Sequence, residues 1–131
     1  MEPRKLAIFD FDGTLIKGDS IVSYILFAKV KKAMTLRHFL GIIAHLPLWG
    51  FRRMTDAQFK SYALQFLASL TPEKRAALDG AFVKEILLPS IYPKGKAVLD
   101  ARKKEGYLVL LLSASTENYM QYVVIHLLIL Q

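Results

Sequence analysis

The feature that most constrains the fold is a short apolar run that ends in two carboxylates. In the stretch LAIFDFDGT, four apolar residues lead directly to Asp10 and Asp12, and Gly13 and Thr14 follow. Residues 5–9 are predicted to form a strand, and the chain turns at the glycine. The sequence therefore predicts that both aspartates lie at the carboxyl end of a strand, where a turn lets them face one pocket.

A second strand is predicted at residues 108–112, LVLLL, because its continuous apolar run is typical of a strand buried on both faces of a parallel sheet. Before it, Pro93 begins a predicted helix that Gly106 ends in a left-handed cap. After it, a helix is expected to begin soon after Ser115, and residues 126–131 fit either the end of this helix or a third strand. These elements predict an α/β fold with a parallel sheet.

Residues 20–88, between the two strands, are predicted to form an inserted helical cap. Apolar stripes at helical spacing run through the segment, and Ser20, Thr55 and Thr71 are candidates for capping its helices. We interpret the stripes as the core of a small helical lobe. The predicted organisation is thus a core of residues 1–19 and 89–131 with a helical cap of residues 20–88.

Composition limits the class of protein. The chain has 131 residues, 53% of them hydrophobic, which excludes a disordered or collagen-like protein. It has no cysteine, which fits a reducing compartment such as the cytoplasm. A formal net charge of +7 favours phosphorylated molecules, nucleic acid or lipid headgroups as partners. No signal peptide is expected, because the apolar run near the amino terminus is too short and is broken by Asp10. No transmembrane helix is expected either, because the longest uncharged apolar stretch, residues 39–51, is shorter than the roughly 20 residues that span a bilayer.

The two aspartates suggest chemistry with phosphate. Neighbouring carboxylates repel each other unless a cation, a shared proton or hydrogen bonds compensate, and Mg²⁺ prefers oxygen ligands of this kind. A carboxylate can also attack phosphorus, while a second carboxyl group protonates the leaving oxygen and then activates water. Gly13 would let the backbone approach an anion closely, and Thr14 adds a donor. For an isolated pair of acids, a turn in which Asp10 and Asp12 only cap backbone amides is the alternative.

The string FDFDGTLIKGDS resembles the first motif of the haloacid dehalogenase superfamily, D-x-D-G-T after a hydrophobic strand, and it matches completely from Asp10 to Thr14. The string VLLLSAS is similar to the second motif, in which Ser113 ends the next core strand. A helical segment between these motifs is typical of the phosphoserine phosphatase-like branch. The resemblance implies a partial Rossmann-like parallel sheet with an inserted helical cap.

The resemblance also implies roles for single residues. Asp10 would be the nucleophile and a magnesium ligand, and Asp12 would be the general acid and base, with its backbone carbonyl on the metal. Ser113, Gly13 and Thr14 would surround the phosphate. Asp19 stands where amino-acid phosphatases of this branch read the substrate's ammonium group, although it fits a helix cap equally well. The implied activity is Mg²⁺-dependent hydrolysis of a small phosphomonoester through an aspartyl phosphate; the acid at Asp12 favours a phosphatase over a dehalogenase.

The resemblance is incomplete after the second motif. Family members continue to a lysine in a third motif and to acids in a fourth, whereas residues 116–131 contain no lysine and Glu117 is their only acid. We therefore expect the chain to represent the first part of a family member and to be weak or inactive alone. A sheet of two or three strands is also expected to leave an uncovered edge or face that promotes self-association.

The apolar run of residues 39–51, which has arginines on both sides, allows two interpretations. It is either a helix of the cap core, broken near Pro47, or an interfacial segment with Trp49 and Phe51 at a lipid boundary. The second interpretation predicts a protein at the membrane periphery that acts on a phospholipid phosphate. A non-catalytic basic helical binding module is a further alternative; with no recognisable nucleic-acid motif in the sequence, nucleic acid is not the expected partner.

Overall fold

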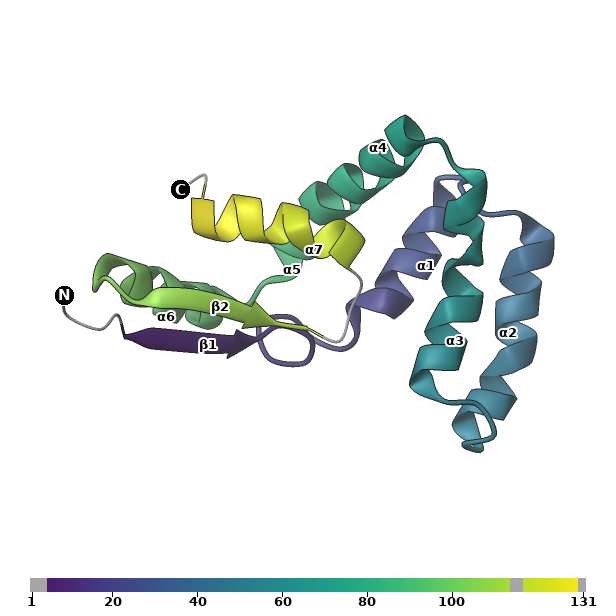
Figure 1. Ribbon diagram of the computed structural model, residues 1–131, viewed down its shortest axis with the longest axis horizontal. Coiled ribbons are helices and arrows are strands. Elements are labelled where there is room, and N and C mark those ends of the chain that lie inside the picture. Colours follow the sequence, from purple (N-terminus) through teal and green to yellow (C-terminus); the bar gives the residue numbers. More distant parts are fainter. Residues whose placement is uncertain (1–4, 114–116, 130–131) are drawn as a thin grey trace. The chain divides into compact units, whose positions relative to one another are not determined.

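The computed structural model describes residues 5–113 and 117–129. The chain divides into two compact units, which Figure 1 shows: a core unit, Met1–Ser20 with Asp79–Gln131, and a helical unit, Ile21–Leu78. The predicted cap of residues 20–88 thus contains the whole helical unit together with Ser20 and residues 79–88 of the core unit.

The core unit contains a parallel sheet of two strands, β1 (Leu6–Asp10) and β2 (Leu108–Leu112), whose arrows point the same way in Figure 1. Leu6 pairs with Leu108, and Asp10 pairs with Leu112. The second strand has its predicted bounds, and the first begins and ends one residue later than predicted. The structure confirms the α/β class with a partial Rossmann-like core.

One face of this sheet is exposed. Val109 is buried, whereas Leu108, Leu110 and Leu112 are 43–55% exposed, as is Ile8 of β1 at 54%. The prediction that both faces of β2 are buried is therefore wrong: side chains alternate between the faces, and the described residues cover only the face of Val109. The expected uncovered face is present.

Two helices of the core unit form where the sequence predicts them. Helix α6 (Pro93–Lys104) begins at its proline and ends in a Schellman motif, in which Gly106 has φ +86° and the Tyr107 amide donates to the Arg102 carbonyl. Helix α7 (Glu117–Val124) continues as a π-helical segment, η3 (Ile125–Ile129). The last segment is thus helical up to residue 129, so the alternative prediction of a third strand is wrong for residues 126–129. Ser115 and residues 130–131 lie outside the described residues.

Helix α4 (Pro72–Phe82) belongs to both units. It passes into η2 (Val83–Leu87) and the short α5 (Leu88–Ser90) of the core unit. The Thr71 hydroxyl accepts the Lys74 amide and so caps α4, as predicted.

The helical unit contains α1 (Ser20–Val30), α2 (Leu36–Gly50), α3 (Asp56–Ala63), the 3₁₀ segment η1 (Leu64–Ser69) and the start of α4. Thr55 and Gln58 form the predicted capping box at the start of α3. The predicted apolar stripes supply buried residues of this unit: Ile21, Tyr24, Ile25, Ala28, Phe59, Ala63, Phe66, Leu67 and Leu78. No helix within the described residues is both long and apolar enough to cross a membrane.

Helix α2 continues through Pro47, so the predicted break there is wrong. Proline lacks an amide hydrogen and therefore removes one helical hydrogen bond. Here the loss falls in the last turn, and the Pro47 carbonyl still accepts the Phe51 amide at 2.9 Å. The helix therefore survives for one more turn before it ends at Gly50.

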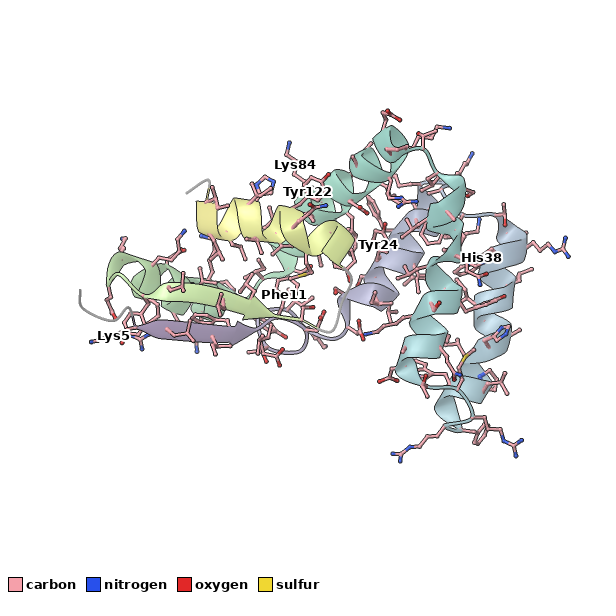
Figure 2. The ribbon with its side chains drawn as sticks, viewed as in Figure 1. Lys5, Phe11, Tyr24, His38, Lys84 and Tyr122 are labelled. Atoms are coloured by element: carbon pink, nitrogen blue, oxygen red, sulfur yellow. The ribbon has the colours of Figure 1, made fainter. Side chains whose placement is uncertain are left out.

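Helices α2 and α3 are joined by contacts around Tyr62. Its ring lies 4.1 Å from the ring of His45 and 5.5 Å from that of His38, which Figure 2 labels. His45 Nδ1 lies 2.7 Å from the Gly41 carbonyl oxygen, and His38 Nε2 lies 3.0 Å from that of Ala63. These histidines have backbone partners and serve the packing of the two helices.

Gly41 is expected to be essential for this packing. A methyl group added at Gly41 would overlap the Tyr62 hydroxyl, whereas one added at Gly50 of the same helix would meet nothing within 4 Å. We expect Gly41→Ala to lower the free energy of unfolding by about 1–3 kcal/mol. Gly50→Ala should leave it unchanged or raise it by about 0.5–1 kcal/mol. Denaturant unfolding monitored by circular dichroism measures both.

A double-mutant cycle identifies the cause. In a Tyr62→Phe background the overlapping oxygen is absent, so Gly41→Ala should cost less than in the parent protein. An equal cost in the two backgrounds would show that Tyr62 is not the neighbour that excludes a side chain at residue 41.

Candidate active site

The two sequence motifs meet at the carboxyl end of the sheet. Asp10 is the last residue of β1 and pairs with Leu112, the last residue of β2. The ladder continues for one step, in which the Phe11 amide donates to the Leu112 carbonyl at 2.9 Å. Ser113, the residue after Leu112, therefore lies next to the turn that follows Asp10. In open parallel sheets, ligands bind at this end of the strands.

The turn after β1 is fixed by buried side chains. Phe11, labelled in Figure 2, is fully buried, and Leu15 and Ile16 are 1% and 3% exposed. The Phe11 carbonyl accepts the amides of both residues, at 3.0 and 3.2 Å. Gly13 has φ +77°, a backbone conformation that favours glycine. The apolar side chains thus anchor the turn while its polar part faces outward.

The first turn of α6 supports the same loop. The Tyr92 amide donates to the Leu15 carbonyl at 2.8 Å, and a methyl group added at Gly95 would come within 2.9 Å of the Leu15 side chain. Gly95 therefore lets α6 approach Leu15 closely. The loop that carries the acids is held from both the strand and the helix.

Asp12 accepts hydrogen bonds on both oxygens of its carboxylate. Its Oδ1 accepts the Ser20 amide at 2.8 Å, and its Oδ2 accepts the Ser113 hydroxyl at 2.7 Å. The residue is half-buried. The hydroxyl donor lies 101 residues away in the sequence, so this bond directly connects the two motifs. A carboxylate with one hydrogen bond to each oxygen has a fixed orientation.

Asp10 is placed differently from Asp12. It is exposed, and the oxygen of the Thr14 hydroxyl lies 3.5 Å from Asp10 Oδ2, the limit of a hydrogen bond. Gly13 and Thr14 are exposed as well. The structure therefore presents an accessible carboxylate beside a carboxylate that is fixed, which is the arrangement a nucleophile and its acid-base partner need.

A buried hydrogen bond beneath the site was not expected from the sequence. The Ser20 hydroxyl lies 2.7 Å from the Tyr119 hydroxyl of α7, and both residues are fully buried. Phe82 packs on Tyr119 edge to face, with 5.1 Å between ring centroids. Ser20 is the first residue of α1 rather than the cap before it. The same residue donates to Asp12, so this hydroxyl pair fixes the position of one Asp12 donor.

Asp19 is exposed and lies between Gly18, with φ +78°, and Ser20. Asp19 thus directly precedes Ser20, whose amide donates to Asp12. The two roles considered for Asp19, as a substrate ligand and as a helix cap, stay predictions.

The acids fit magnesium in their chemistry. Mg²⁺ takes one or two carboxylates together with phosphate and water, and the carboxylate of Asp10 and the backbone of Asp12 offer oxygen donors at one end of the sheet. Within the described part of the chain, no group of three or more His, Cys, Asp or Glu side chains is close enough to hold a metal ion.

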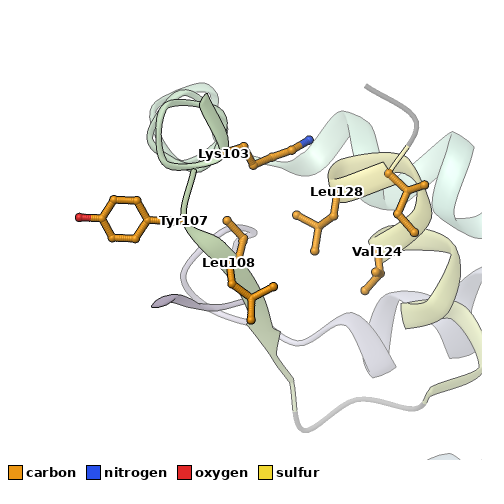
Figure 3. Close-up of a pocket in the computed structure, with 7 residues that line it drawn as sticks. Lys103, Tyr107, Leu108, Val124 and Leu128 are labelled. Atoms are coloured by element: carbon orange, nitrogen blue, oxygen red, sulfur yellow. The ribbon is translucent and has the colours of Figure 1, made fainter. Parts of the chain in front are cut away.

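A pocket of about 350 Å³ lies elsewhere in the core unit, as Figure 3 shows. It is lined by Lys103, Tyr107, Leu108, Val109, Val124, Leu128 and Ile129. Leu108 begins β2, whereas Asp10 lies beside the end of that strand, about 13 Å away at the usual rise of a strand. This pocket is not part of the candidate site.

The buried hydroxyl pair predicts a coupled loss of stability. Tyr119→Phe leaves the Ser20 hydroxyl without this partner and should lower the free energy of unfolding by about 1–3 kcal/mol. Tyr122→Phe, on the same helix, is the matched control and should change it by less than about 0.5 kcal/mol. In the cycle with Ser20→Ala, Tyr119→Phe should cost less than in the parent chain. Additive losses in denaturant unfolding would disprove the coupling.

Comparisons with known proteins agree with this fold. The crystal structure of a protein with unknown function from Bordetella pertussis Tohama I superimposes with a TM-score of 0.79 at 21% sequence identity, and it shares the fold. The match covers 96% of this chain and 57% of that protein, so the chain spans little more than half of its length. No curated protein matches the chain. The profile of the haloacid dehalogenase-like hydrolases matches residues 7–129, and the chain therefore belongs to the haloacid dehalogenase-like hydrolase family.

Proposed function

We propose that the protein is a magnesium-dependent phosphomonoesterase that works through an aspartyl phosphate on Asp10. The observation that carries this proposal is the pair of unequal acids at the end of the sheet. Asp10 is accessible, and Asp12 is fixed by Ser20 and Ser113. Membership of a hydrolase family supports the reaction class, and the intact D-x-D-G-T string supports phosphate as the group attacked.

The proposed reaction has two steps. An Asp10 carboxylate oxygen attacks phosphorus, the bond from phosphorus to the ester oxygen breaks, and Asp12 gives its proton to the leaving alcohol. Water then attacks phosphorus, Asp12 takes the proton, and Asp10 is released together with inorganic phosphate. When bound, magnesium would offset the negative charge of the phosphate and of Asp10. The exposed turn at Gly13 would supply backbone donors to the phosphate oxygens.

Ser113 has a second task in this scheme. A hydroxyl carries one proton, and the Ser113 hydroxyl donates it to Asp12 Oδ2 at 2.7 Å. If the hydroxyl turns toward a bound phosphate, Asp12 Oδ2 loses this donor and can carry the proton that the leaving oxygen needs. Substrate binding would thus change Asp12 from a pure acceptor into an acid.

The helical unit supports assignment to the phosphoserine phosphatase-like branch. It is inserted between the strands that carry the two motifs, as in that branch. We propose a small phosphorylated molecule as the substrate.

Beryllofluoride with Mg²⁺ mimics an aspartyl phosphate and tests the proposal directly. We expect saturable binding by isothermal titration calorimetry, abolished by Asp10→Asn because the coordinating carboxylate is lost. Asp56→Asn, another exposed aspartate, is the matched control and should bind as the parent does. Absence of binding by the parent chain, together with tight binding to anionic surfaces, would instead favour a non-catalytic binding module.

Hydrolysis of p-nitrophenyl phosphate tests the reaction itself. We expect a Mg²⁺-dependent rate that Asp10→Asn abolishes, because the nucleophile is lost. A rate that Asp10→Asn leaves unchanged would contradict the proposed role of Asp10.

Ser113 is expected to contribute through its hydroxyl. Ser113→Ala should weaken beryllofluoride binding about tenfold or more, since a hydrogen bond to a charged group contributes about 1.5–3 kcal/mol. Ser113→Thr keeps the hydroxyl and should restore most of the affinity. Equal affinities of the alanine variant and the parent would exclude Ser113 from the phosphate site.

A further inference from the structure

The net charge of the protein resides entirely in the helical unit. Residues 21–78 contain nine Lys and Arg against two acids, a formal charge of +7, whereas the rest of the chain has nine against nine. The unit with the candidate catalytic acids is therefore neutral overall. The helical unit alone attracts anions over long range.

The helical unit also exposes apolar side chains in two rows. On α1, Val22, Leu26 and Val30 recur every four residues and are 49–76% exposed. On α2, a second row of apolar side chains lies within an arc of about 140° around the helix axis, counted at 100° per residue. This row continues past the end of the helix. It consists of Leu36, Leu40, Ile43, Leu46 and Phe51, which are 42–79% exposed. We call these two rows the apolar face.

A groove joins the two rows. It has a volume of about 250 Å³, and all its lining residues are apolar, including Leu26 of α1 and Ile43 of α2. Trp49 forms part of its wall: the indole stacks on Phe59 at 4.7 Å and donates to Asp56 Oδ1 at 2.6 Å. Trp49 is thus a packing residue. Phe51, 79% exposed, is the aromatic side chain that is available to a partner.

Cationic residues lie at both ends of the apolar face. Lys29 lies in the last turn of α1, Lys31 and Lys32 follow the helix, and Arg37 lies in the first turn of α2 close by in the chain. Arg52 and Arg53 follow Phe51 at the other end of α2. Apolar stripes with cations at their borders suit the interface of an anionic bilayer, where acyl chains meet phosphate groups. A second copy is a poorer partner, because it would bring two units of charge +7 together.

We propose that the helical unit binds the surface of an anionic lipid bilayer through the apolar face, with Phe51 inserted and Arg52 and Arg53 at the lipid phosphates. The helices would lie in the plane of the interface. This inference is independent of the proposed catalytic function, because all the residues that carry it belong to the helical unit.

Vesicle co-sedimentation of the full chain tests the proposal. We expect binding to phosphatidylcholine vesicles that contain phosphatidylglycerol, weaker binding to phosphatidylcholine alone, and a loss of binding as salt is raised. Phe51→Ser should lower the partition coefficient about tenfold. Replacement of both Arg52 and Arg53 by Gln should lower it about twentyfold or more, because each basic residue contributes about fivefold.

Matched substitutions in the core unit provide the controls. Val98→Ser removes an apolar side chain that is 47% exposed, and Lys94→Gln with Lys104→Gln removes two exposed charges. These variants should bind vesicles nearly as the parent does, and circular dichroism checks that all variants keep their helical content.

Three results would overturn the proposal. The first is a parent chain that does not sediment with anionic vesicles. The second is an equal loss of binding in the core-unit variants. The third is a lipid-free dimer, seen by sedimentation velocity, that Phe51→Ser dissociates, since the apolar face would then bind a second copy.

Discussion

The parallel register of β1 and β2 is the constraint on which the candidate site depends. It sets Asp10 beside Leu112, so Asp12, two residues after Asp10, and Ser113, the residue after Leu112, come within hydrogen-bond distance. A shift of one residue would turn the side chains of one strand to the other face and separate the pair. The buried anchors Phe11 and Leu15 oppose such a shift, because they are already enclosed by the core unit.

Features that depend on neighbouring residues were predictable from the sequence, whereas contacts between residues far apart in the sequence were not. The capping box at Thr55 and the left-handed cap at Gly106 each depend on a few neighbouring residues, and both were predicted correctly. The apolar run of β2 wrongly predicted burial on both faces, because such a run does not specify what covers it. Tyr119 was missed because its signal, one tyrosine in an apolar helical stripe, does not reveal a partner 99 residues away.

The two units differ in their chemistry. The core unit is neutral overall and holds the acids of the first motif, while the helical unit has a charge of +7 and an exposed apolar face. Attraction of an anion or an anionic surface can therefore be supplied by residues that take no part in bond making. Substitutions that alter where the protein binds and those that alter what it does are expected to map to different segments of the chain.

The pairing of Leu6 with Leu108 also has a consequence for the order of folding. During synthesis β1 emerges first and has no partner until about a hundred further residues have been made, whereas α2 and α3 are close in sequence and can pack as soon as both are present. The helical unit is thus able to form on an incomplete chain. Asp10 is translated long before Ser113, yet the site around it is assembled only after β2 has left the ribosome.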